Sequence, residues 1–189
     1  KNISELIAMA KKDPDGISYA SFGNGSASHL AGALFTNHAG IKMTHVPYKG
    51  GGPAITDTLG GQIPLSFSAF GLALPHVRAG KLNALATTGA TRSKLLPEVP
   101  TIEEAGNLKG YEMSIVYAVW TPAGVPAPIL NKISKALDQV TASSAFKEKV
   151  ASDGGEVMNI NTPAESQVYF QKEMQRLSKI VKDGNIKAD

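Results

Sequence analysis

Hydrophobic residues recur along the chain at two spacings, which alternate through its first half. Ile3, Leu6, Ile7 and Ala10 recur at helical spacing, so residues 2–12 are predicted to form a helix. After it, short runs rich in apolar and β-branched residues predict strands, and the segments between them predict helices. The predicted strands are residues 17–21, 43–46, 63–67 and 82–87, and the predicted helices between them are residues 28–39, 53–59 and 72–79.

This alternation predicts an α/β fold, in which a mostly parallel sheet is flanked by helices. The carboxyl ends of parallel strands lie along one edge of such a sheet, and ligands of open α/β proteins bind there. The order of the elements therefore places the loops at residues 23–26, 49–52 and 68–70 around one crevice.

The second half of the chain is predicted to be mainly helical. Residues 89–110 are predicted to be a loop, except for a short helix capped by Thr101 and Glu104. Residues 111–120 predict a strand, and the proline-rich segment 121–128 predicts a connection, so we place a domain boundary between residues 1–120 and residues 121–189.

Beyond that boundary the pattern predicts three helices and one lone strand. Residues 129–141 and 144–152 predict helices, and residues 156–160 predict the strand. The last helix begins at Thr162 with a capping box completed by Glu165. Its expected buried stripe consists of Phe170, Met174, Leu177 and Val181.

The turn after the first predicted strand has the composition of an anion-binding turn. Gly23 and Gly25 allow positive φ and close backbone approach, and Ser26 and Ser28 can cap the helix that follows. Free amides at such a helix start suit a carboxylate or a phosphate. An ordinary strand-to-helix turn that binds only water fits this motif equally well.

Composition and charge narrow the class of protein. With 42% hydrophobic and 19% charged residues among 189, the chain can form a hydrophobic core. The net charge of +3 is spread over both halves, so nucleic acid is not expected as a partner. The absence of cysteine excludes disulfides and thiolate chemistry. No apolar run is long enough to span a membrane, and a signal peptide, if the protein is exported, would lie outside this chain.

The usual motifs of catalysis, metal binding and nucleotide binding are missing from the sequence. Ser26 is not in a Gly-x-Ser-x-Gly elbow, and the run from Lys49 to Gly52 lacks the Gly-Lys-Ser/Thr of a phosphate loop. The histidines lack metal-site spacing, so no metal and no cofactor are expected. Binding of a small anion is the favoured activity, and the alternative is an enzyme that acts on a small anionic substrate with Ser26, His29 and Lys49.

Several motifs together resemble one family of proteins. They are Ile3-Ser-Glu-Leu-Ile-Ala8, Tyr19-Ala-Ser-Phe-Gly-Asn-Gly-Ser26 with His29-Leu30, His45-Val-Pro-Tyr-Lys-Gly50, Leu59-Gly-Gly-Gln62, Pro75-His76 with Ala79-Gly-Lys81, Arg92-Ser93 with Pro97-Glu-Val-Pro-Thr101, and Pro122-Ala-Gly124. In this order they resemble the Bug/TctC family, the extracytoplasmic solute-binding proteins of tripartite tricarboxylate transporters. The resemblance covers nearly the whole chain.

The resemblance implies a type II-like periplasmic binding protein, in which two α/β lobes close on a small carboxylate and deliver it to membrane permease subunits. It implies that residues 1–120 are the second, ligand-gripping lobe and that residues 121–189 pack on the first lobe. The expected signal peptide and much of the first lobe are not in this sequence. We therefore expect the isolated chain to bind weakly or not at all, and to dimerise or swap domains.

The resemblance also assigns candidate ligand-binding residues and no catalytic ones. The glycine turn contributes Ser21, Asn24, Gly25 and Ser26, and His29 is expected either to point at the ligand or to pack under the loop. Further candidates are Lys49, which can equally point into solvent, Gly50, whose loop amides are favoured, and Ser68 at the end of the third predicted strand.

Overall fold

A computed structural model describes residues 1–158, 160, 162–184 and 186 of the chain. The chain divides into two compact units, and each is described by itself. Unit 1 comprises Lys1–Ser114 and Met174–Asp189, and unit 2 comprises Ile115–Glu173. The expected assignment of residues 1–120 and 121–189 to different lobes concerns a whole two-lobed protein and stays a prediction.

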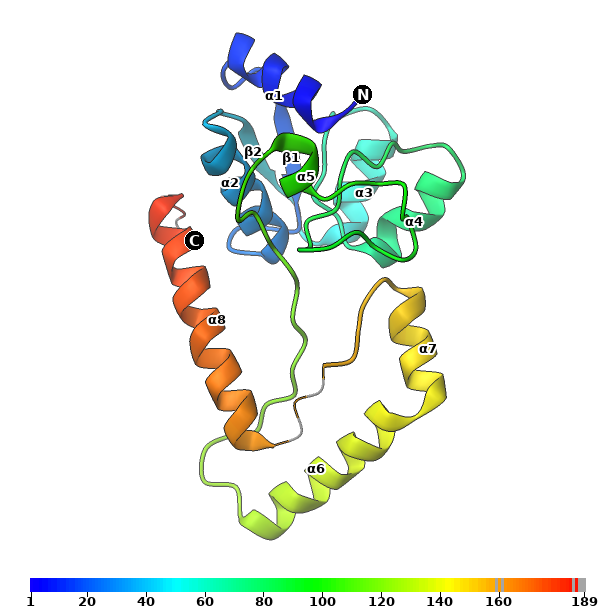
Figure 1. Ribbon diagram of the computed structural model, residues 1–189, viewed down its shortest axis with the longest axis vertical. Coiled ribbons are helices and arrows are strands. Elements are labelled where there is room, and N and C mark those ends of the chain that lie inside the picture. The colour runs from blue at the N-terminus through cyan, green and yellow to red at the C-terminus, as the bar shows by residue number, and fades with distance from the viewer. Residues whose placement is uncertain (159, 161, 185, 187–189) are drawn as a thin grey trace. The chain divides into compact units, whose positions relative to one another are not determined.

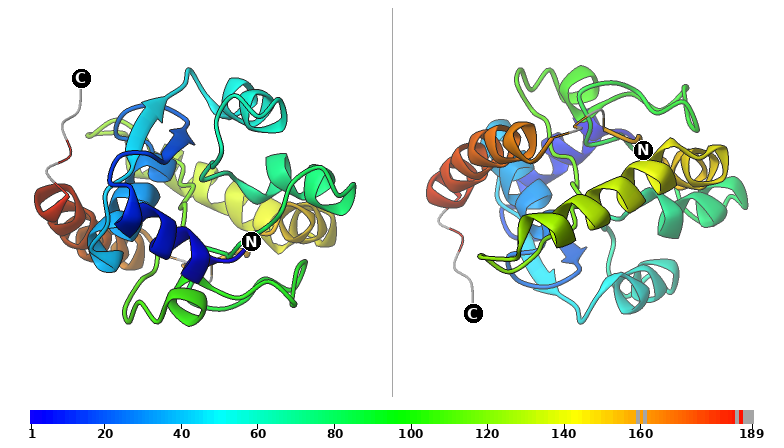
Figure 2. Two further views of the ribbon diagram at one scale, coloured as in Figure 1. Left: turned by 90° about the horizontal axis from the view of Figure 1, so that it is seen from above. Right: turned by 90° about the horizontal axis from the view of Figure 1, so that it is seen from below.

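The centre of unit 1 is a pair of parallel strands, β1 (Ser18–Ser21) and β2 (Thr44–Pro47), joined by helix α2 (Ala27–Ala39). Their register pairs Ser18 with Thr44 and Ser21 with Pro47. Helices α2 and α3 (Gly51–Leu59) lie on opposite sides of the strand pair (Figures 1 and 2). The mixed α/β fold with a parallel sheet is thus confirmed.

The third predicted strand, residues 63–67, pairs with β1 over only a short distance. Ala20 and Ser66 form a single parallel bridge. The amide of Ala20 donates to the carbonyl of Leu65 at 2.8 Å, and the amide of Phe67 donates to the carbonyl of Ala20 at 3.3 Å. The segment therefore runs beside β1 in the predicted direction, although it does not extend into a regular strand.

Two other predicted strands do not form. Of residues 82–87, only Thr87 makes a bridge, to Thr101 just before α5 (Ile102–Gly106). Of residues 111–120, Met113 donates its amide to the carbonyl of Thr88 at 2.8 Å, but no strand pairing continues along the segment. Both segments have strand-like composition, but a strand needs continuous pairing with a neighbour, and these segments make only isolated contacts.

Local signals set the helix ends in unit 1. The side chain of Asn2 accepts a hydrogen bond from the amide of Glu5 and starts α1 (Ile3–Lys12). Gly40, with φ of 60°, ends α2 in the left-handed conformation that glycine adopts without strain. Helix α3 and helix α4 (Phe70–Arg78) each begin two residues earlier than predicted.

The main core of unit 1 lies between α1, α2, β1 and the segment after α5. Phe35 and Tyr111 are both fully buried in it. The hydroxyl of Tyr111 donates to the carbonyl of Ala31 at 3.0 Å, so its one polar atom is satisfied. Ile180, near the end of α8 (Pro163–Asp183), is buried in the same core.

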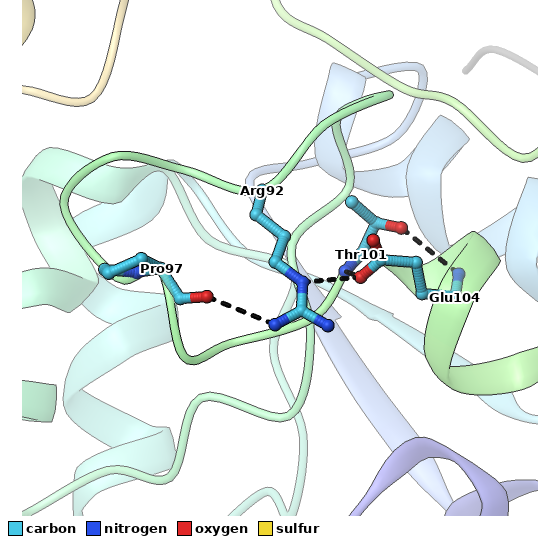
Figure 3. Close-up of polar contacts among 4 residues, drawn as sticks. All are labelled: Arg92, Pro97, Thr101 and Glu104. Carbon is cyan, nitrogen blue, oxygen red and sulfur yellow. Dashed lines mark hydrogen bonds and ion pairs between the residues drawn. The ribbon is translucent and has the colours of Figure 1, made fainter.

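The loop before α5 is tied down by a small polar network (Figure 3). The Nε of Arg92 donates to the carboxylate of Glu104 at 2.7 Å, and its Nη1 donates to the carbonyl of Pro97 at 3.2 Å. Glu104 also completes the predicted capping box with Thr101, which is confirmed. The Arg92 hydrogen bond lowers the pKa of the Glu104 carboxyl below its usual range.

Unit 2 contains α6 (Ala127–Ala142), α7 (Ser144–Ser152) and the first half of α8. The predicted capping box of Thr162 and Glu165 is present at the start of α8. No strand forms at residues 156–158 or 160, and residue 159 of that predicted strand lies outside the described residues. None of the described residues in 115–173 is buried.

The buried stripe predicted for α8 is wrong at three of its four positions. Phe170, Met174 and Val181 are exposed by 41%, 48% and 37%, whereas Leu177 packs against the main core of unit 1. Amphipathic spacing identifies an apolar face but does not supply the surface that covers it. Of the helices that the structure describes, none is long and apolar enough to cross a membrane.

Candidate functional site

Three loops of unit 1 stand at the same edge of the sheet. The carboxyl ends of β1, of β2 and of the segment that bridges β1 at Ser66 lead through short loops into α2, α3 and α4. Because these three segments run parallel, the amino ends of the three helices meet at this edge. The partial positive charge at a helix amino end favours an anion.

The first loop, residues 22–26, is held by a serine cap. The Oγ of Ser26 donates to the carbonyl of Gly23 at 2.6 Å and accepts from the amide of His29 at 3.3 Å. Gly23 and Gly25 have φ of 129° and 71°, which side chains rarely adopt. A Cβ at Gly23 would also stand 3.2 Å from the carbonyl of Tyr48. The positive φ predicted for both glycines is confirmed.

Ser21 ties the end of β1 to β2 and to the first and second loops. Its Oγ lies 2.6 Å from Nε2 of His45 on β2 and accepts from the amide of Gly23 at 3.2 Å. Its carbonyl accepts from the amide of Tyr48 at 3.1 Å. Because Ser21 is fully buried, its side chain shapes the loop from beneath.

Two histidines stack under this loop. The rings of His29 and His45 have centroids 3.7 Å apart and lie within 10° of parallel. The amide of Gly25 donates to Nδ1 of His29 at 3.1 Å. Burial lowers the pKa of His29, while burial and the nearby His29 together lower the pKa of His45 to about 4. Both rings are therefore neutral at neutral pH.

The second and third loops leave helix amides without side-chain caps. Gly50, with φ of 113°, precedes α3, and Ala69 precedes α4, and neither helix start has a side-chain cap hydrogen bond. Lys49 is exposed, whereas Ser68 is half-buried with its Oγ 2.7 Å from that of Ser66. The amides of residues 51, 52, 70 and 71 thus face no side-chain cap and suit an external acceptor, whereas Pro53 has no amide hydrogen and the amide of Leu72 donates to the carbonyl of Ala69.

The structure brings most of the predicted site residues to this edge. Ser21, Asn24, Gly25, Ser26 and His29 belong to the first loop and the first turn of α2. Gly50 begins α3, and Ser68 stands just before α4. Lys49 lies in the second loop and is exposed there. Whether each residue contacts a ligand stays a prediction.

His45 was missed as a site residue, although the sequence carried a signal for it. Strand register pairs His45 with Tyr19, so its side chain lies on the same face as Tyr19 and Ser21. On the opposite face Ala20 and Val46 pack with α3. The alternation along β2 therefore predicts that His45 and Val46 face opposite sides of the sheet. The partners of His45 can be located only from the register of β1 against β2.

The arrangement does not form the catalytic centre of the enzyme alternative. The hydroxyl of Ser26 bonds to the carbonyl of Gly23 and lies 3.0 Å from the Oγ of Ser28. Nδ1 of His29 accepts a hydrogen bond from the amide of Gly25, so this nitrogen does not serve as a base for the Ser26 hydroxyl. In the part of the chain that the structure describes, no cluster of three or more His, Asp or Glu residues could hold a metal ion.

Parallel strands whose carboxyl ends lead through glycine loops into helix starts are typical of α/β proteins that bind a ligand at that edge of the sheet. Comparison with protein families then places this chain more narrowly. The chain belongs to the family described as "Tripartite tricarboxylate transporter family receptor", whose sequence pattern matches residues 1–186. The resemblance inferred from the motifs is confirmed.

Relatives and solved structures agree with this placement. The UPF0065 protein in the TAR-I ttuE-ttuC' intergenic region of Agrobacterium vitis is 36% identical over 185 residues, which cover 97% of this chain and 53% of that protein. R. palustris Rpa4515, solved with adipate, is 29% identical with a TM-score of 0.88, over 98% of this chain and 61% of that one. MatC (Rpa3494) from Rhodopseudomonas palustris, solved with bound malate, is 26% identical with a TM-score of 0.81, and the match covers 96% of this chain and 62% of that one.

The chain spans about half the length of the curated relatives that it matches. Its similarity to solved structures likewise covers less than two thirds of those chains.

Proposed function

We propose that this chain is the carboxylate-gripping part of a periplasmic solute-binding protein, which delivers a small carboxylate to the membrane subunits of a tripartite tricarboxylate-type transporter. Family membership supports this proposal. So does the presence of adipate and malate in two similar solved structures. Both ligands are short dicarboxylates, which makes that class of compound the first choice for this chain.

The observation that carries the proposal is the meeting of three helix starts at one edge of the sheet. Helices α3 and α4 lack side-chain caps, and the first loop contains two glycines with positive φ. Backbone amides at the starts of α3 and α4 can donate to carboxylate oxygens, whereas the amides of residues 22, 23, 25 and 26 are bonded within unit 1. Each such charge-assisted hydrogen bond contributes about 1.5–3 kcal/mol when it is shielded from water.

The predicted residues take different roles in this proposal. Asn24 is exposed at the tip of the first loop, and Gly50 and Ser68 stand at the starts of α3 and α4, so these three are proposed to contact the ligand. Gly25 and Ser26 are proposed to shape the loop, because the amide of Gly25 donates to Nδ1 of His29 and the amide of Ser26 donates to the carbonyl of Gly23. Lys49 is proposed to add positive charge near the ligand from its exposed position.

We also propose that, within the expected segment 121–189, residues 121–173 belong with the other lobe of a two-lobed protein, whereas Leu177 and Ile180 pack in unit 1. Large apolar side chains in this part of the chain are exposed, including Ile129 at 51% and Val140 at 50%. Surfaces of this kind are normally covered by a partner. In the isolated chain they favour dimerisation or domain swapping, which light scattering over a concentration series would detect as a mass above that of the monomer.

Calorimetric titration of the chain with adipate and malate tests the proposed ligand class. The matched controls are adipamide and the diamide of malic acid, which keep the length of each ligand and remove its charges. We expect both dicarboxylates to bind weakly, because one lobe supplies half of a closing site, and both diamides to give no heat of binding. Binding of a neutral sugar or a nucleotide in place of the dicarboxylates would contradict the proposal.

We further propose that this lobe binds its ligand without catalysing a reaction. The family consists of receptors, and the Ser26 hydroxyl serves as a helix cap. Assays with activated esters and phosphate esters should show no turnover. Turnover that disappears in Ser26→Ala would contradict this statement.

A further inference from the structure

The stacked imidazoles of His29 and His45 join three segments of the candidate site. His29 comes from the first turn of α2 and His45 from β2. Each ring has one nitrogen bonded to the first loop or to its base: Nδ1 of His29 to the amide of Gly25, and Nε2 of His45 to Ser21. The pair therefore connects the loop to the sheet.

The contact with Gly25 fixes the tautomer of His29. A backbone amide can only donate, so Nδ1 of His29 must be unprotonated and the ring proton must be on Nε2. In this state the ring holds the Gly25 amide inward, toward α2. The amide of Gly25 therefore shapes the loop and does not face the ligand. Any contact between the loop and a ligand is made by other groups of the loop.

The contact with Ser21 fixes the other end of the loop. Ser21 Oγ lies 2.6 Å from Nε2 of His45 and also accepts from the amide of Gly23. His45 thus sets the position of the serine hydroxyl that holds Gly23. Tyr19 supports the ring of His45 from the neighbouring strand, with centroids 5.2 Å apart.

We propose that His29 and His45 are a pair of positioning residues that hold residues 23–26 in the conformation that receives the ligand. This inference rests on the proposed function, because the ligand is the proposed carboxylate. His29 acts through Gly25, and His45 acts through Ser21 and Gly23. Neither ring needs to touch the ligand.

Four substitutions separate this role from simple filling of space. Nδ1 of histidine is two bonds from Cβ, as is Oδ1 of asparagine, whereas Nε2 is three bonds away, as is Oε1 of glutamine. His29→Asn therefore keeps the acceptor for Gly25, and His29→Gln misplaces it. At the second position the order reverses, because His45→Gln keeps the partner of Ser21 and His45→Asn loses it.

Amide hydrogen exchange measured by NMR gives a readout that needs no ligand. We expect exchange of the Gly25 amide to accelerate at least roughly tenfold in His29→Gln and to stay near wild type in His29→Asn, as the loss of one hydrogen bond requires. The Gly23 amide should accelerate in His45→Asn and not in His45→Gln. If glutamine, the larger residue, were the milder substitution at both positions, the rings would only fill space and the proposal would be wrong.

A measurement on the wild-type chain tests the proposal even if the variants do not fold. The ¹⁵N shifts of His29 should show an unprotonated Nδ1 at neutral pH, and a protonated Nδ1 would overturn the proposal. Titration with malate and adipate then completes the test. Affinity should fall several-fold in His29→Gln and His45→Asn and be retained in the other two variants. If neither ligand binds the wild type while the exchange pattern holds, the proposed function fails and the positioning role stands.

Discussion

Unit 1 has a core of buried large apolar side chains, whereas none of the described residues of unit 2 is buried. In unit 1 Phe35 and Tyr111 have no accessible surface, whereas in unit 2 Tyr117 is 88% exposed and Trp120 64% exposed. Helices α6 and α7 bury no residue at all. Both units nevertheless contain well-capped helices, so local signals can form a helix in either unit, but only unit 1 has the packing of a self-sufficient fold.

The two units should differ most in the unfolding free energy that is lost when a phenylalanine ring is removed from each. Phe35→Ala removes a fully buried ring and should cost about 3–5 kcal/mol of unfolding free energy, because a cavity replaces it. Phe170→Ala removes a ring that is 41% exposed and touches Trp120, and should cost less than about 1 kcal/mol. Urea unfolding monitored by circular dichroism measures both. Equal losses would show that unit 2 is as well packed as unit 1.

The helices were the part of the fold that sequence predicted well, because their signals are local. The predicted bounds of α7 match those observed, and the caps at Asn2 and Thr101 are present. Strands depend on distant partners, so the strand-like composition of residues 82–87 and 111–120 could not show that they would lack continuous pairing. The apolar face of α8 was likewise evident in the sequence, but the sequence did not show which surface, if any, packs against that face.

The site follows the same division between local and distant signals. The positive φ of Gly23 and Gly25 and the cap by Ser26 could be predicted from the turn itself. The contact of Ser21 with His45 could not, because it depends on the register of β1 against β2.

The second prediction concerns close packing inside unit 1. A Cβ at Gly32 on α2 would stand 2.2 Å from the ring of Tyr19, so Gly32→Ala should destabilise unit 1 by about 1–3 kcal/mol. The control is Gly52→Ala on α3, where nothing lies within 4 Å of the added carbon. This control should be neutral or stabilising by about 0.5–1 kcal/mol, since alanine favours a helix. Thermal unfolding of both variants measures the difference, and a neutral Gly32→Ala would show that the α2–β1 contact is loose.

The third prediction is that acid weakens unit 1 through its histidines. His45 has a pKa of about 4 in the fold, below its ordinary value of 6.5, so the unfolded chain binds more protons between these values. The contribution of His45 to the unfolding free energy should be fully present above pH 6.5 and should be lost as the pH drops toward 4. With allowance for solvent screening of the half-buried ring, the loss is about 1 kcal/mol.

Urea unfolding at pH 7 and pH 5 tests this prediction in the wild type and in His45→Gln. The variant lacks the titrating ring and should show a smaller dependence on pH. Unit 2 contains no histidine, so Trp120 fluorescence, which reports on that unit, should change little over this range. Equal pH dependence of the wild type and the variant would contradict the assignment to His45.

The smallest effect is expected for an exposed ion pair in unit 2. Nζ of Lys149 on α7 lies 2.7 Å from Oδ2 of Asp153, the residue that follows the helix, and the two side chains are 70% and 51% exposed. Asp153→Asn should change the unfolding free energy by at most about 0.5 kcal/mol, because water and salt screen such pairs. Thermal unfolding at low and high salt measures this change. A loss well above that value would mean that α7 has a more protected environment than its exposure indicates.

The central claim is that unit 1 binds a small dicarboxylate through the loops at the carboxyl edge of its sheet. Titration of the ¹⁵N-labelled chain with malate and adipate, followed by amide chemical shifts, tests it most directly. We expect the shift changes to concentrate at residues 23–26, 50–52 and 69–71, those of residues 115–173 to stay unchanged, and the matched diamides to cause no shift changes. Equal shifts with the diamides, or shifts confined to unit 2, would contradict it.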